Sequence, residues 1–170
     1  MVAGKARDEL VEFLQDKDVE YDIYPPSLNK VYSARRAKVG KDMYKQLGVD
    51  NKDLASKLKH VRKNFTFFDA PVGLFFTVDL NNPPQWSDIG MFMQTFMLLA
   101  TERGIATCAQ EAWANHSSTV KDYLGIPKEH ILFAGIAVGY ADTSAPVNHL
   151  ITERAPVDEF TIFHKPRSNL

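Results

Sequence analysis

Cysteine is almost absent from this chain, since Cys108 is the only one in 170 residues. A single thiol cannot form an internal disulfide, which excludes a disulfide framework and predicts a reducing, cytoplasmic setting. An excess of either charge is also lacking, because 20 basic side chains nearly balance 21 acidic ones. The resulting net charge of -1 gives no electrostatic basis for binding nucleic acid or an anionic membrane surface.

Long hydrophobic runs and the common catalytic motifs are missing as well. The longest apolar stretch, residues 89–100, is too short to span a bilayer, and the first ten residues are too charged for a signal peptide. No Gly-x-Gly-x-x-Gly follows a strand pattern, and no Walker-type phosphate loop occurs. The five histidines lack metal-ligand spacing, so we expect no metal site. The neighbours His116 and Ser117 favour a helix cap over a nucleophile and base.

The hydrophobic pattern that is present predicts one α+β domain over residues 1–170. Two continuous apolar runs, residues 72–79 and 131–140, indicate buried strands, and residues 1–3 resemble the end of another strand. Helical spacing and cap residues predict helices over residues 6–14, 33–47, 52–64 and 117–124. We expect Asp50 to cap the third of these helices and Gly125 to end the fourth.

The most informative stretch is a central helix that begins at Ser87 or Asp88 and breaks at Glu102–Gly104. Its residues are apolar on nearly every face, which predicts burial on nearly every face. The segment that follows is therefore expected at a fixed place in the interior, where Cys108 would be a small buried hydrophobe.

The last part of the chain, residues 142–170, is polar and interrupted by Pro146 and Pro156. Partial alternation of apolar residues over 157–163 predicts an arm that packs on another surface. Earlier in the chain, the basic run from Arg35 to Lys41 is typical of a solvated helix face.

Three segments, taken in order, resemble the nitroreductase superfamily of FMN-dependent flavoproteins, and within it the nitrobenzoate reductase-like subgroup. They are DAPVGLFFTVD (residues 69–79), WSDIGMFMQTFMLLATERGIATCAQEAW (residues 86–113) and LGIPKEHILFAGIAVGYADTSAPVNHLITERAPVDEF (residues 124–160). Each segment alone is a weak signal, whereas their combination and order are specific. The resemblance extends over nearly the whole chain.

This resemblance implies a small central sheet flanked by helices, in a homodimer that holds two FMN molecules at its interface. The C-terminal arm, residues 142–170, would pack on the partner subunit. The segment Ala109, Gln110, Glu111 and Ala112 would pass the flavin edge, with the amides of Glu111 and its neighbour near flavin N5. Ala112 stands where many family members have glycine. Arg154 would bind the FMN phosphate, although the residues alone favour a surface salt bridge to Glu153 or Asp158.

The function that the resemblance implies is hydride transfer from NAD(P)H through FMN to a nitroaromatic, a quinone or a similar small molecule. The flavin performs this chemistry, so no catalytic side chain is expected. Family members begin with an Arg-rich phosphate-binding helix and a Gln-Pro-Trp segment, and neither occurs here, which predicts a chain shortened at its N-terminus. Two alternatives stay open: a non-catalytic dimerisation or binding module without flavin, and a relative that acts on halogenated or unsaturated compounds.

Overall fold

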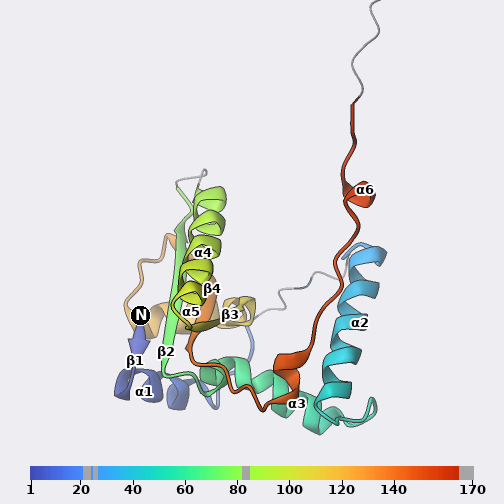
Figure 1. Cartoon of the computed structure of the whole chain (residues 1–170). Helices are drawn as coiled ribbons and strands as arrows, with labels where there is room; N and C mark the ends of the chain where they lie inside the picture. Colours follow the sequence, from blue (N-terminus) through green and yellow to red (C-terminus); the bar gives the residue numbers. More distant parts are fainter. Residues whose placement is uncertain (21–23, 25–26, 82–84, 165–170) are drawn as a thin grey trace, which may run out of the picture.

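The centre of the molecule is a four-stranded antiparallel sheet with the strand order β1-β2-β4-β3. The computed structural model describes residues 1–20, 24, 27–81 and 85–164 (Figure 1). Its strands are β1 (Val2–Ala3), β2 (Val72–Asp79), β3 (Ala106–Gln110) and β4 (His130–Gly139). The expected α+β class is confirmed, as are the strands expected at residues 1–3, 72–79 and 131–140 to within one residue.

Helices cover both faces of this sheet. They are α1 (Lys5–Leu14), α2 (Lys30–Gln46), α3 (Leu54–Arg62), α4 (Gln85–Glu102), α5 (Ser117–Leu124), α6 (Val157–Phe160) and the 3₁₀ helices η1 (Lys63–Asp69), η2 (Glu111–His116) and η3 (Pro146–His149). Helix α4 packs on one face, while α1, α5, η1 and η2 pack on the other. Helix α2 and the chain after η3 stand to one side of the sheet (Figure 1). No helix in the described part of the chain has the length and apolarity to cross a membrane.

Two glycines in the sheet allow aromatic rings to lie directly on its backbone. A Cβ atom at Gly135 of β4 would clash with the indole of Trp113, and one at Gly73 of β2 would clash with the ring of Phe67. Both rings are fully buried, in a cluster that also contains Leu10, Val120 and Leu132. The close approach of ring and strand is therefore possible only because these positions carry no side chain.

A β-bulge changes which face of the sheet the side chains of β4 occupy. Phe76 pairs with Ala134 and Thr77 pairs with Leu132, so Phe133 is an extra residue. As a result, Phe133 and Ala134 both pack toward α4, whereas Leu132 joins the opposite cluster. The sequence run ILFAGIAVGY gives no sign of this change of face.

The prediction that the central helix is buried on nearly every face is wrong for the single chain. Of α4, only Met93 and Ala100 are buried, and five large apolar side chains are exposed: Trp86, Met91, Phe92, Leu98 and Leu99. The sheet covers a single side of the helix, so much of the remaining apolar surface has no partner among the described residues. The break after the helix is confirmed, since Gly104 has a φ of 70° and Ile105 donates its N–H to the carbonyl of Ala100.

Several expected boundaries and caps also need correction. Asp53, rather than Asp50, caps α3 by accepting the N–H of Ser56. Helix α3 ends at Arg62, and η1 begins at the next residue, Lys63. Helix α2 begins at Lys30 with Asn29 as its cap, earlier than expected. Helix α4 begins at Gln85, before the expected cap positions. Cys108 is exposed instead of buried, because β3 is an edge strand of the sheet.

Helix α5 is capped by a residue distant in sequence. Glu20 accepts the N–H groups of Ser118 (2.9 Å) and Thr119 (2.8 Å) with its two carboxylate oxygens. Ser117, one of the two expected openers of this helix, instead accepts the N–H of Leu132 with its hydroxyl. The carboxylate thus fixes residues 16–20 to the N-terminus of α5, where negative charge is favoured.

The contact between Trp113 and Gly135 predicts the effect of adding one methyl group. Gly135→Ala should lower the free energy of unfolding by about 1–3 kcal/mol, because the indole must move off the sheet. Gly40→Ala is the matched control in α2, where a Cβ meets no atom within 4 Å. That control should raise stability by about 0.5–1 kcal/mol, as expected for glycine in a helix interior. Denaturant titration measures both changes, and an unchanged Gly135→Ala midpoint would contradict the contact.

The Glu20 cap predicts a pH dependence of stability. Burial raises the pKa of Glu20, but the N–H groups of Thr119 and Ser118 outweigh it and hold the pKa below its ordinary value of 4.5. The stabilisation is therefore complete above pH 4.5 and is lost as the pH falls through the lowered value. Glu20→Gln should cost about 0.5–1 kcal/mol at pH 7 and almost nothing at pH 2. Glu12→Gln, exposed on α1, is the control, and an equal cost at both pH values would refute the cap.

Candidate functional site

The four residues expected at a flavin edge form the junction between β3 and η2. Strand β3 ends at Gln110, which pairs with Gly135, and η2 begins at Glu111. Ala109 and Glu111 are exposed, Ala112 is half-buried and Gln110 is buried. The junction therefore lies at the open edge of the sheet, with small side chains on both sides of Gln110 and Glu111.

The side chain of Gln110 is used inside the protein. It is 2% exposed and donates from Nε2 to the backbone carbonyl of Asn64 (2.8 Å) and to Asn64 Oδ1 (3.4 Å). Its Oε1 accepts the indole N–H of Trp113 at 3.4 Å. Only the backbone of Gln110 is therefore available to a ligand at this edge.

Trp113 anchors the junction from the other side. Its ring lies 4.5 Å from that of Phe67 and meets Phe65 and Phe75 edge-on at 5.5 and 4.9 Å between ring centroids. Such aromatic pairs contribute about 0.5–1.5 kcal/mol each beyond the burial of their surface. Glu111 and Ala112 thus lie between the buried amide of Gln110 and the buried indole of Trp113.

The chemistry of the junction suits the edge of a flat ring that carries hydrogen-bond acceptors. The first N–H groups of a 3₁₀ helix have no partner inside that helix, so those of Glu111 and Ala112 are not used by η2 itself. Alanine side chains at 109 and 112 allow another planar group to approach the backbone closely. By this criterion the residues present fit the ring system of FMN.

Arg154 lies on the arm beside α2, at a cleft of about 240 Å³. Its guanidinium donates to the Thr152 hydroxyl and to the carbonyls of Thr152 and Glu153. Neither alternative salt bridge forms among the described residues, because Glu153 pairs with Lys38 (3.1 Å) and Asp158 makes no ion pair. Arg154 therefore faces the cleft as a cation without a carboxylate partner, which fits a phosphate group.

The basic face of α2 contributes to the same cleft. Arg35 forms an ion pair with Glu159, and Lys38 lies between Asp42 (2.8 Å) and Glu153. Hydrogen bonds from Lys38 to Asp42 and Glu153 raise the pKa of Lys38. The basic run expected to be a solvated face is thus exposed, and two of its members also tie the arm to α2.

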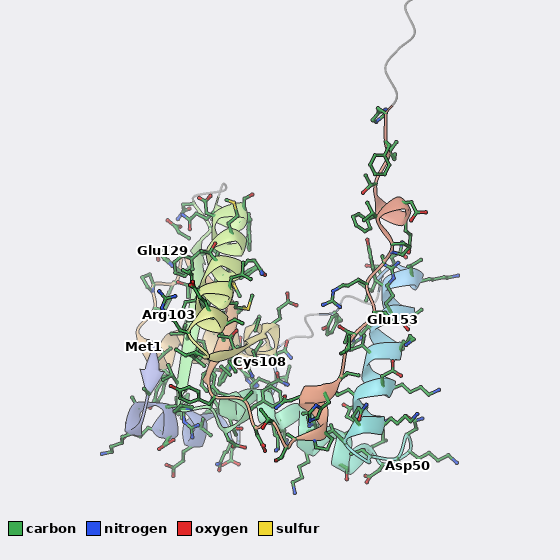
Figure 2. All side chains as sticks on the ribbon, viewed as in Figure 1. Met1, Asp50, Arg103, Cys108, Glu129 and Glu153 are labelled. Carbon is green, nitrogen blue, oxygen red and sulfur yellow. The ribbon has the colours of Figure 1, made fainter. Side chains whose placement is uncertain are left out.

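The two halves of the expected site do not meet within one chain. In Figure 2, Cys108, the neighbour of Ala109, lies by the sheet, while Glu153, the neighbour of Arg154, lies by α2. The expected site residues therefore lie in two separate places, with residues 109–112 at the β3–η2 junction and Arg154 at the cleft beside α2.

Sequence reasoning missed the residues that support the junction. Asn64 and Trp113 were not expected to contact Gln110, and only a buried amide needing partners would have indicated such residues. His116 is buried against the Phe65 ring (4.7 Å), and burial lowers its pKa despite the Glu20 charge and a hydrogen bond to the Asp18 backbone. Among the described residues no hydrogen bond joins Ser117 to His116, and the expected capping role of Ser117 is wrong, because its hydroxyl accepts the N–H of Leu132.

Comparison with known proteins gives one consistent result. A model of the nitroreductase family matches residues 9–140. A 4-nitrobenzoate reductase of Pseudomonas putida is 39% identical over 140 residues, which are 82% of this chain and 62% of that protein. A nitrobenzene nitroreductase of Ectopseudomonas oleovorans is 33% identical over 147 residues, 85% of this chain and 64% of that one. The chain thus spans about three fifths of the length of these curated relatives.

Solved structures agree with the sequence matches. The FMN and NADPH-dependent nitroreductase NfnB from Sphigopyxis sp. strain HMH has a TM-score of 0.89 and 36% identity, covering 96% of this chain and 78% of that one. The FMN-dependent NfnB from Mycobacterium smegmatis, in complex with NADPH, has a TM-score of 0.85 and 30% identity, covering 96% and 77%. The fold expected from the resemblance is confirmed.

Proposed function

The chain belongs to the nitroreductase family, and on that premise we propose that it is an FMN-dependent oxidoreductase using NAD(P)H. The acceptor would be a nitroaromatic, the class that the names of the relatives give, or a quinone or a similar small molecule. When bound, FMN supplies the redox chemistry by accepting a hydride from the nicotinamide and passing it to the acceptor. The residues of this chain bind the cofactor, orient it and set the charge around it.

The observation that carries this proposal is the β3–η2 junction, an exposed backbone segment fixed by buried neighbours. Negative charge develops on the ring system when it is reduced, and backbone N–H groups that are already oriented stabilise such charge without reorganising. We assign this role to the amides of Glu111 and Ala112, with Ala109 and Gln110 completing the surface against the ring edge. The small side chains of exposed Ala109 and half-buried Ala112 support close approach.

The phosphate end of the cofactor is assigned to Arg154. A guanidinium can hold two phosphate oxygens at once, and each charged hydrogen bond contributes about 1.5–3 kcal/mol. Arg154 forms no ion pair with a carboxylate among the described residues, and the carboxylates of the same cleft are paired with Arg35 and Lys38, which supports this role.

The assembly that we propose is a homodimer. The exposed apolar side of α4 is a large unpartnered surface, and Phe160, Ile162 and Phe163 of the arm are likewise exposed. A second copy offers the same two surfaces, so α4 can pack on its equivalent and the arm can lie on the partner, as two-fold symmetry allows. The two groups of site residues would then lie at the subunit interface.

Arg154→Ala should weaken FMN binding by at least tenfold, because the phosphate loses a paired cation. Quenching of flavin fluorescence during titration of purified protein measures the dissociation constant. Arg154→Lys should lose less affinity, and Lys41→Ala, on α2 but not at the cleft, should bind like wild type. Wild-type protein that stays colourless with added FMN would refute the enzymatic proposal.

The same titration distinguishes the proposed enzyme from the main alternative, a chain that binds no flavin. A stable dimer that binds no flavin would identify a non-catalytic dimerisation or binding module. A yellow protein that is reduced by NADPH or NADH and reoxidised by 4-nitrobenzoate or a quinone would support the enzyme. Reoxidation by halogenated or unsaturated compounds alone would assign a different acceptor class.

Leu98→Lys should convert the dimer to a monomer and weaken FMN binding by about tenfold, because a charge would be buried between two copies of α4. Leu98 is 61% exposed in one chain. Leu54→Lys on α3, where the leucine is 75% exposed, is the matched control and should leave the assembly unchanged. Sedimentation velocity measures the oligomeric state, and a wild-type monomer at micromolar concentration would contradict the proposed assembly.

A further inference from the structure

Gln110 is one of two buried polar side chains among the described residues, the other being His116. Its amide is satisfied on both sides, by Asn64 of η1 and Trp113 of η2. Burying an amide costs free energy unless it is fully paired, so an apolar side chain would fill this position more simply. Some property other than packing therefore accounts for a glutamine at the end of β3.

The partners of Gln110 belong to elements that flank the junction. Asn64 lies in η1, and its own side chain donates to the carbonyl of Val61, which fixes it to the end of α3. Trp113 is two residues beyond Glu111 and packs against Gly135, the residue that pairs with Gln110. The Gln110 side chain thus connects η1, β3 and η2 at the point where the backbone turns.

The element that Gln110 contacts is itself under strain. Phe67, Phe68 and Asp69 of η1 have φ values of 55°, 50° and 66°, a conformation that costs non-glycine residues about 1 kcal/mol or more each. Such a turn persists only where its surroundings hold it. The buried ring of Phe67 holds one end, and the bond from Gln110 to the Asn64 carbonyl holds the other.

We propose that Gln110, through Asn64 and Trp113, is a positioning residue that fixes the backbone amides of Glu111 and Ala112 for the flavin edge. This inference rests on the proposed function and deepens it, because it assigns the side chain of Gln110 a role separate from its backbone. An amide that is fixed in advance stabilises charge on the reduced ring better than one that must first reorient. Loosening the junction should therefore weaken the binding of reduced FMN more than that of oxidised FMN.

Gln110→Met is the informative variant, since methionine keeps the length of the side chain and removes all three hydrogen bonds of the amide. We expect FMN binding to weaken by about tenfold. A further tenfold loss for the reduced cofactor would lower the two-electron midpoint potential of the bound flavin by about 30 mV. Trp113→Phe, which removes the 3.4 Å bond to Gln110 and also shrinks the buried ring, should give a smaller change in the same direction.

Two controls distinguish positioning from a general loss of stability. Val120→Ala opens a cavity in the same buried cluster without touching the junction, and it should destabilise the protein while leaving the midpoint potential unchanged. Asn64→Ala keeps the backbone carbonyl that accepts the 2.8 Å bond, so it should retain most of the effect of Gln110. A potential that shifts equally in Gln110→Met and Val120→Ala would overturn the proposal.

Hydrogen exchange of the flavin-free protein tests the positioning without the cofactor. Amides of residues 109–113 should exchange about tenfold faster in Gln110→Met than in wild type, and no faster in Val120→Ala. Unchanged exchange in Gln110→Met would overturn the inference even if FMN binds. If wild-type protein binds no FMN, the proposed function fails, and this measurement still decides whether Gln110 fixes the junction.

Discussion

The contact of the Trp113 indole with the backbone of Gly135 is the constraint on which the rest of the structure depends. It brings η2 directly against β4, which sets where the chain leaves β3 and where α5 begins. The same contact places the ring within reach of Phe65, Phe67 and Phe75, so η1 and β2 pack around it. Gly73 and Gly135 leave room for the rings of Phe67 and Trp113. One face of the sheet is therefore covered by aromatic contacts rather than by a long helix. The junction that would meet the cofactor is therefore attached to the most buried part of the molecule.

The strained turn in η1 is a consequence of this arrangement. Burial of a phenylalanine contributes about 1.5–3 kcal/mol, which is comparable to the cost of the left-handed residues beside Phe67. The turn brings the Asn64 carbonyl to Gln110 and at the same time directs Ala70 and Pro71 into β2. The free energy of ring burial thus holds a backbone path that local preferences oppose, and that path supports the edge of the candidate site.

The sequence predicted those features that depend on local pattern. Continuous apolar runs identified β2 and β4, and Gly104 and Gly125 ended their helices as expected, with φ values of 70° and 66°. Features that depend on distant contacts were not predicted. Glu20 caps α5 from 98 residues away, and Gln110 meets Asn64 across 46 residues. The burial of α4 was overestimated because periodicity shows which residues are apolar but not whether their partner lies in the same chain.

A site made of backbone N–H groups explains why side-chain motifs gave so little information about function. Every residue except proline supplies a backbone N–H group. Positions 109–112 therefore carry no chemical signature, and only family resemblance identified them. What the structure adds is the means by which such a site is held: a buried amide and a buried indole on either side of an exposed segment. The arm and α2 contrast with this, since they bury no residue of α2 and are joined by exposed ion pairs, which contribute little stability. A site assembled from both parts would combine a rigid ring contact with a phosphate contact that depends on assembly of the subunits.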